Sequence, residues 1–299
     1  MNIYSSISSN VWKTWLIMFL FVVFITTIVY VFSKTLGYGF PLVGFTLVIA
    51  GAMSLASYYY SDKIILGMSG AKEIKKKDNP ELFRIVENLC IGAGLQMPKI
   101  YIINDSAPNA FATGRDPKNA VVCVTTGILQ KLNKVEMEGV IAHELSHVRN
   151  YDIRLMAIVA ILVGFVALFA DIFMRSLWFG GARRDRNDRD NSSSVFMLIG
   201  IALAILSPII ATLIQLAVSR KREFLADASG VLLTRYPEGL ALALEKISKD
   251  REPLEAANNA TAHLYIVNPF KGKEIGNFLA GLFNTHPPIE ERIKILRSM

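Results

Sequence analysis

Four long runs of apolar residues alternate with charged segments along this 299-residue chain. A helix needs about 20 apolar residues to cross a bilayer core of about 30 Å. Each run approaches or exceeds that length, and we expect four membrane-spanning helices at Trp15 to Phe32, Phe40 to Tyr59, Leu155 to Phe173 and Val195 to Val218. Since no small-residue cleavage site follows the first run, we interpret it as a retained span rather than a signal peptide.

The four spans divide the chain into two membrane hairpins and two polar segments. Residues 1–61 and 155–218 form the hairpins, and residues 62–154 and 219–299 form the two polar segments. Because two spans return the chain to the side that it left, both polar segments lie on one face and can build one domain. Most basic residues near span ends fall on that face, which favours the cytoplasm. The Arg- and Asp-rich loop at 183–194 argues for the opposite orientation.

The first polar segment shows patterns of a helix followed by short strands. Asn79 is a typical helix cap before Pro80, and the helix should run to about Ala93. Segments rich in strand-forming residues then predict strands at 99–103, 110–113 and 120–125, and turn-forming residues separate these strands. Asn133 and Glu136 form a capping-box pattern that should open a second helix. We therefore expect a mainly helical domain with a small β-sheet.

Composition supports a membrane protein and argues against a nucleic-acid partner. Hydrophobic residues make up 52% of the chain, and the charged fraction of 19% is below the soluble average of about 25%. The net charge of +7 comes without a nucleic-acid-binding motif, so the basic residues are better explained by anionic lipids at the cytoplasmic face. Cys90 and Cys123 are expected to be reduced and unpaired, which excludes a disulfide framework.

The stretch HELSH at residues 143–147 is typical of a zinc site on a helix. His143 and His147 are four residues apart, so their side chains lie about 5–6 Å from each other on one helix face. Both imidazoles can then reach one zinc ion at about 2.0–2.1 Å. Glu144 projects beside them, where it can take a proton from a water molecule that the metal activates. A chance occurrence on a charged helix is the alternative.

A catalytic zinc usually has three protein ligands, so one ligand is missing from HELSH. Asn150 and Ile153 occupy the positions at which a known extension of the motif carries glycine and a third histidine. Glu223 in EFLAD is the best remaining ligand, because the two intervening spans return it to the same membrane face. Asp227, one turn later, can hydrogen-bond a histidine ligand. EFLAD could instead be only a charged helix end at the membrane surface.

Several motifs together resemble the HtpX branch of membrane zinc endopeptidases, relatives of the zinc-dependent CAAX prenyl protease. These are MSGAKEI, NAFATG, HELSH, EFLAD and THPPIEER, which follow in matching order over nearly the whole chain. The resemblance implies a cytoplasmic zincin-like catalytic domain with one Zn²⁺ per chain, bound by His143, His147 and Glu223. It implies that Glu144 is the general base and that Asp227 supports a histidine ligand.

The same resemblance assigns two further elements of the site. His286 in THPP, by itself a loop or cap residue, is implied to stabilise the oxyanion of the tetrahedral intermediate. NAFATG, by itself a short core strand, is implied to hold the substrate peptide by β-augmentation. The residues of this implied substrate strand are Asn109, Ala110, Phe111, Ala112, Thr113 and Gly114. His263 matches no motif and is expected to be a surface or packing residue.

The function implied by the resemblance is endoproteolysis of membrane proteins at the cell membrane, in quality control under stress. Polypeptides and the lipid bilayer are the expected partners. Prenyl-protein processing is an alternative, although four spans are few for a chamber that accommodates a lipid. A zinc-binding scaffold without turnover is a second alternative, against which Glu144 argues. A transporter is disfavoured, since no pair of interrupted spans recurs in two halves.

Overall fold

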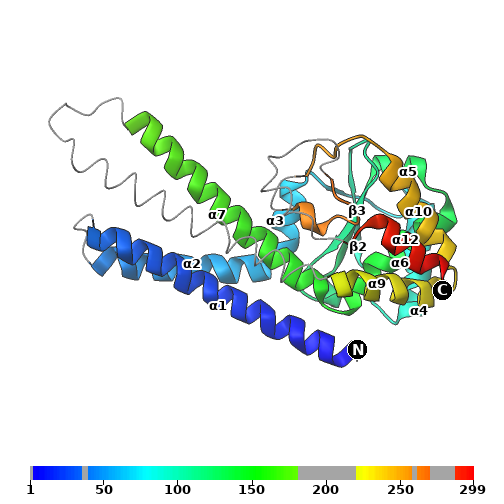
Figure 1. Ribbon diagram of the computed structural model, residues 1–299, viewed down its shortest axis with the longest axis horizontal. Helices are drawn as coiled ribbons and strands as arrows, with labels where there is room; N and C mark the ends of the chain where they lie inside the picture. Colours follow the sequence, from blue (N-terminus) through cyan, green and yellow to red (C-terminus); the bar gives the residue numbers. More distant parts are fainter. Residues whose placement is uncertain (1–2, 36–39, 181–219, 258–260, 270–286) are drawn as a thin grey trace.

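The computed structural model describes residues 3–35, 40–180, 220–257, 261–269 and 287–299. Three long helices, α1, α2 and α7, form an arm that leads into a rounded part containing the sheet and the shorter helices (Figure 1). The elements are α1 Ile3–Thr35, α2 Phe40–Tyr59, α3 Ser61–Met68, β1 Lys72–Glu73, α4 Pro80–Ala93, β2 Lys99–Ile103, β3 Ala110–Thr113, η1 Pro117–Asn119, β4 Val121–Thr125, α5 Thr126–Lys131, α6 Lys134–Arg149, α7 Asp152–Gly180, α9 Arg220–Thr234, α10 Pro237–Lys249, η3 Ala262–Leu264 and α12 Ile289–Arg297.

The arm contains the first three predicted spans. Within the described residues, one helix segment, Ser8–Thr27 of α1, is by itself long and apolar enough to cross a membrane. The segment Val43–Tyr59 passes the same test only together with α3, from which it is bent by 83°. The third predicted span falls within α7, which packs against α1 and α2. The fourth, Val195 to Val218, lies outside the described residues.

Within the part of the chain that the structure describes, the sheet has four strands in the order β1-β2-β4-β3. Strands β2 and β4 are parallel, whereas β1 and β3 pair antiparallel with their neighbours, so that β3 lies at an edge. The three predicted strands are present, with β4 beginning at Val121 rather than Ala120. Strand β1 was not predicted, because a pairing of two residues, Lys72 and Glu73, carries no recognisable alternation.

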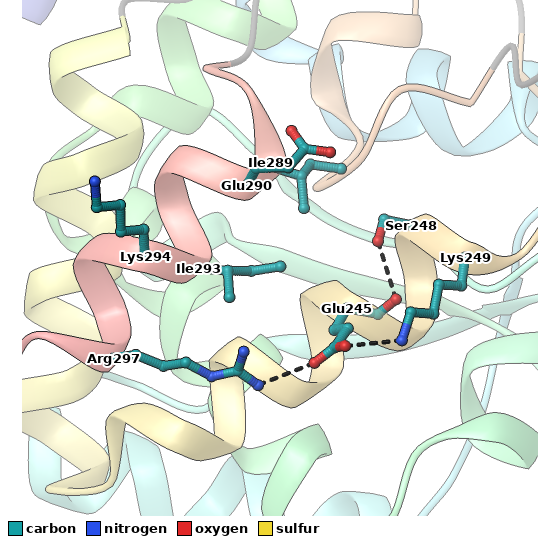
Figure 2. A pocket seen from close by; sticks show the side chains of 8 residues that line it. All are labelled: Glu245, Ser248, Lys249, Ile289, Glu290, Ile293, Lys294 and Arg297. Atoms are coloured by element: carbon teal, nitrogen blue, oxygen red, sulfur yellow. Dashed lines mark hydrogen bonds and ion pairs between the residues drawn. The ribbon is translucent and has the colours of Figure 1, made fainter.

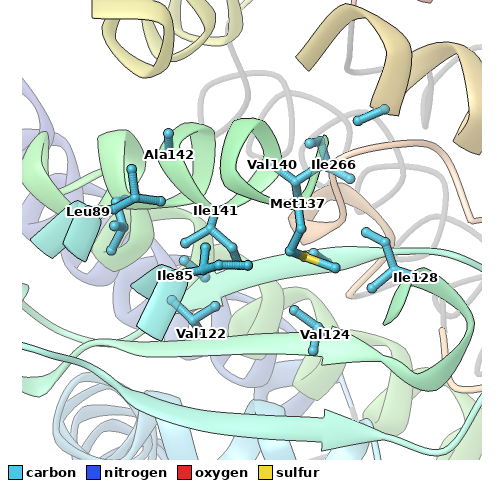
Figure 3. Packing of buried hydrophobic residues seen from close by; sticks show 14 of the residues in the cluster. Ile85, Leu89, Val122, Val124, Ile128, Met137, Val140, Ile141, Ala142 and Ile266 are labelled. Carbon is cyan, nitrogen blue, oxygen red and sulfur yellow. The ribbon is translucent and has the colours of Figure 1, made fainter. Parts of the chain in front are cut away.

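Both faces of the sheet are covered, which explains why all five residues of β4 are buried. Val122 and Val124 point to α4 and α6, where Figure 3 shows them opposite Ile141 and Met137. The intervening Cys123 belongs to a second cluster that includes Leu155 and its neighbours on α7. Burial of each such side chain contributes about 1.5–3 kcal/mol. The two clusters fix α6 and α7 on opposite faces of one strand.

Helix α6 begins as predicted and ends before the arm. Asn133 accepts a hydrogen bond from the Glu136 backbone N–H, and the Glu136 side chain accepts one from the Asn133 N–H. The helix ends at Arg149 with Asn150 as its C-cap, and Tyr151 has a φ of 59°, so the chain bends before α7 starts at Asp152. Helices α6 and α7 are therefore two separate helices joined by a bend.

Helix α9 lies directly against the HELSH part of α6. A Cβ added at Gly230 of α9 would be only 3.1 Å from the backbone nitrogen of His143. A glycine at this position lets the two helices approach closely, as a side chain would push them apart. The close approach brings Glu223, two turns before Gly230, to the histidines of α6.

Candidate metal centre

Three buried side chains from α6 and α9 present their ligand atoms to one point. The Nε2 atoms of His143 and His147 are 3.2 Å apart. The Glu223 carboxylate places Oε2 3.7 Å from His143 Nε2 and Oε1 3.6 Å from His147 Nε2. Two ligand atoms bound to a tetrahedral zinc at about 2.0–2.1 Å are about 3.4 Å apart. The donor set and its spacing therefore fit a zinc ion, and the three residues are those that the sequence indicated.

Each histidine is oriented by a buried carboxylate on its other ring nitrogen. His143 Nδ1 lies 2.9 Å from Asp227 Oδ1, and His147 Nδ1 lies 3.1 Å from Asp152 Oδ2. Donation from Nδ1–H to a carboxylate leaves the Nε2 lone pair free for a metal. Asp227 was expected near a histidine from its helical spacing with Glu223, whereas no sequence motif pointed to Asp152.

A fully buried arginine from α12 neutralises the acidic side of the site. Arg292 donates from Nε to Asp227 Oδ2 at 2.9 Å and from Nη2 to Oδ1 at 2.7 Å. Its Nη1 donates to the carbonyl oxygen of Ile266 at 3.1 Å and lies 3.5 Å from Glu223 Oε2. Burial by itself raises the pKa of Asp227, but the charges and hydrogen bonds of Arg292 and His143 together outweigh burial, and the pKa is lowered. Asp227 is thereby held as a carboxylate.

The two histidines have opposite pKa shifts. Burial lowers the pKa of His143. Burial also opposes protonation of His147, but the hydrogen bond to Asp152 and the charge of Glu223 raise its pKa to about 9. A protonated His147 can therefore donate from Nε2 to the neutral His143. Because a metal needs neutral imidazoles, metal binding should release this proton.

Glu144 lies at the same site, with its side chain 2% exposed. Among the described residues its Oε1 has no hydrogen-bond partner, and such an orphaned polar atom is rare in a buried position. Burial raises its pKa to about 7, which the neighbouring Glu223 charge also favours. A carboxyl group with this pKa can both accept and return a proton near neutral pH.

The NAFATG segment forms β3 and its ends, beside Glu144, and is buried along its length. The backbone N–H of Ala112 hydrogen-bonds the Glu144 carboxylate. At the start of the strand, the chain's own residue Ile266 donates its N–H to Ala110 O at 3.1 Å. Asn109 Nδ2 donates to the carbonyl oxygen of Val267 at 3.0 Å. Part of the implied substrate strand therefore contacts the chain itself.

Of the two remaining histidines, one lies among the described residues and the other does not. His263 is a packing residue, 3% exposed, whose Nε2 lies 3.1 Å from the carbonyl oxygen of Met156 on α7. His286 lies outside the described residues, so its implied role in oxyanion stabilisation stays a prediction.

The residues that build this centre match a known peptidase family. A family model described as Peptidase family M48 matches residues 76–299, which include all the site residues named above. The chain belongs to peptidase family M48. It is therefore a metalloendopeptidase that acts on polypeptides, and the resemblance seen in the motifs is confirmed.

Similar proteins extend the M48 assignment over the full length of the chain. The Protease HtpX homolog of Dictyoglomus thermophilum is 46% identical, over 99% of this chain and 94% of its own. That of Caldanaerobacter subterraneus is 45% identical, over 100% of this chain and 98% of its own. The crystal structure of S. mikatae Ste24p has a TM-score of 0.51 at 19% identity, covering 95% of this chain and 66% of that one. This structure shows that the fold is shared.

A groove elsewhere on this M48 peptidase includes none of the metal-site residues. It has a volume of about 530 Å³ and lies between α10 and α12, where Figure 2 shows Glu245 between Lys249 and Arg297. Its ion pairs are partly exposed, and Ile289 and Ile293 of α12 line its apolar part. Helix α12 therefore presents one face to this groove, while Arg292 lies outside the groove and contacts the metal centre.

Proposed function

We propose that this M48 peptidase is a zinc-dependent endopeptidase of the cytoplasmic membrane. We further propose that it cleaves misfolded or damaged membrane proteins in stress-linked quality control. The observation that carries the zinc assignment is the triangle of two Nε2 atoms and one carboxylate, with edges of 3.2 to 3.7 Å. When bound, zinc supplies Lewis-acid activation of a water molecule and of the scissile carbonyl.

Glu144 is the proposed proton carrier of the reaction. Its Oε1, which has no partner within the described residues, takes a proton from the attacking water. The protonated side chain then returns this proton to the leaving amine. A pKa of about 7 suits both transfers, because neither protonation state is strongly preferred at neutral pH. His286 is proposed to donate to the oxyanion.

The substrate is proposed to bind beside Glu144 as an additional strand on β3. Ala112 hydrogen-bonds Glu144, so a peptide paired with this edge would place its backbone next to the proposed base. Ile266 already contacts Ala110, and the remainder of the edge toward Gly114 is the part proposed for substrate. Pairing through backbone groups recognises extended segments rather than a particular sequence, which suits unfolded substrates.

We propose four spans with the catalytic part in the cytoplasm. The apolar segment Ser8–Thr27 and the bent second helix support the first hairpin, and the apolar run at 195–218 supports the last span. Labelling of single cysteines in intact cells tests this arrangement, since both native cysteines are buried. An impermeant thiol reagent should label Asp188→Cys in the loop at 183–194 but not Lys118→Cys. The reverse pattern would place the catalytic domain outside.

Cleavage by the full chain in liposomes tests the substrate assignment. We expect the zinc-loaded chain to cleave a co-reconstituted, destabilised membrane protein, to stop after chelation and to resume with stoichiometric zinc. A farnesylated peptide with a CAAX end serves as a competing substrate. Cleavage of only the farnesylated peptide would favour prenyl-protein processing instead.

A further inference from the structure

The first membrane helix reaches the metal centre through one buried amide. Asn10 lies near the beginning of α1 and is 3% exposed. Its Nδ2 donates to Asp152 Oδ1 at 2.7 Å and to the carbonyl oxygen of Asn150 at 2.9 Å. These two contacts join residues about 140 positions apart in the sequence, at the bend between α6 and α7.

The contacts of Asn10 continue to a proposed metal ligand. Asp152 uses Oδ1 for Asn10 and Oδ2 for the Nδ1–H of His147. The carboxylate torsion of an aspartate is broad, so one hydrogen bond to His147 fixes the carboxylate plane poorly. A second bond to its other oxygen, from a donor that is itself anchored to Asn150, fixes that plane. The positively charged Arg222 places Nη1 3.6 Å from the same Oδ1.

We propose that Asn10 is a positioning residue of the metal centre, which orients His147 through Asp152. The inference rests on the zinc site proposed above. The first membrane helix is then part of the peptidase site and not only its anchor. A catalytic domain separated from α1 should bind zinc more weakly than the full chain, because the Asp152 carboxylate loses its second fixed contact.

A merely structural role for Asn10, in docking α1 against α7, makes a different prediction. Thr14 lies one turn later on the same helix, is 0% exposed, and donates its hydroxyl hydrogen to the carbonyl oxygen of Asn10. It therefore shares the burial of Asn10, and its side-chain hydrogen bond stays within α1. Thr14→Val is therefore the matched control: it perturbs a buried residue of α1 but removes no hydrogen bond to Asp152.

The test measures zinc affinity of the full-length chain in detergent by competition with a chelator. We expect Asn10→Leu to raise the zinc Kd about tenfold, at the low end for loss of a group that orients a metal ligand. Asn10→Asp keeps the shape but cannot donate, and it should weaken zinc binding at least as much. Thr14→Val should bind zinc as the wild type does. Apparent Tm values of the metal-free variants show whether each is folded.

A double-mutant cycle decides whether Asn10 acts through Asp152. In an Asp152→Ala background, Asn10→Leu should change the zinc Kd less than twofold, because the group it orients is absent. Equal effects of Asn10→Leu in both backgrounds would overturn the proposal. So would wild-type zinc affinity in both Asn10 variants. Failure of the wild-type chain itself to bind zinc would instead refute the zinc site of the proposed function.

Discussion

Removal of Arg292 tests the energetics of the metal centre independently of catalysis. Its side chain is 0% exposed and forms two charge-assisted hydrogen bonds to Asp227 and one to the Ile266 carbonyl. Arg292→Met keeps much of the length and apolar surface but leaves the Asp227 charge buried without its cation. Breaking a buried ion pair from one side costs about 3–5 kcal/mol.

This loss is large enough to measure as a change in thermal stability. A protein of this size loses roughly 2–4 °C in Tm for each kcal/mol, so we expect Arg292→Met to lower the apparent Tm by about 6–20 °C. The measurement uses the metal-free full chain in detergent, so that loss of zinc does not contribute. Adding Asp227→Asn should restore part of the loss, because the Asp227 charge then no longer remains buried without its cation.

Arg297 on the same helix provides the control. It pairs with Glu238 and Glu245, but its side chain is 44% exposed, and such surface pairs contribute at most about 1 kcal/mol. Arg297→Met should therefore change the Tm by a few degrees at most. A Tm loss in Arg292→Met no greater than that in Arg297→Met would refute the reasoning about burial.

Two further predictions concern helix packing and thiol reactivity. Gly139→Ala should destabilise the chain by about 1–3 kcal/mol, since its Cβ would lie 2.7 Å from the Leu240 backbone nitrogen. Gly67→Ala, with nothing within 4 Å of the added Cβ, should not, and denaturant unfolding compares the two. Burial raises the pKa of Cys90 to about 11 and raises that of Cys123 as well. At pH 8.5 the thiols of the native chain should therefore be alkylated roughly a hundredfold more slowly than those of the unfolded chain. The alkylation rate of Cys90 should rise as the pH approaches its pKa. Equal rates in the native and unfolded chains would contradict the burial of the thiols.

The parts of the site that depend on neighbouring residues in the sequence were predictable. The capping box of Asn133 and Glu136 and the spacing of His143 and His147 are both set within one helix. Helix α4 likewise begins after its Asn79 cap. In such cases a hydrogen bond or a helix face is determined by residues three or four apart.

The residues that complete the site could not be found in this way. Arg292 is 65 positions from Asp227, and Asn10 is 142 positions from Asp152. No local pattern connects them, because their contacts are made only when α1 and α12 pack onto the domain. Asp152 is closer in the sequence, five residues after His147. The bend at Tyr151, however, has neither the glycine nor the proline that usually marks one.

The central claim is that Glu144 transfers the proton. The metal is bound by three other side chains, His143, His147 and Glu223. Zinc content and cleavage of an unfolded protein, measured on the same purified preparations, test it most directly. We expect the wild type to hold one zinc and cleave, Glu144→Gln to hold one zinc without cleaving, and Glu223→Gln to lose both zinc and cleavage. Cleavage by Glu144→Gln at the wild-type rate would contradict the account.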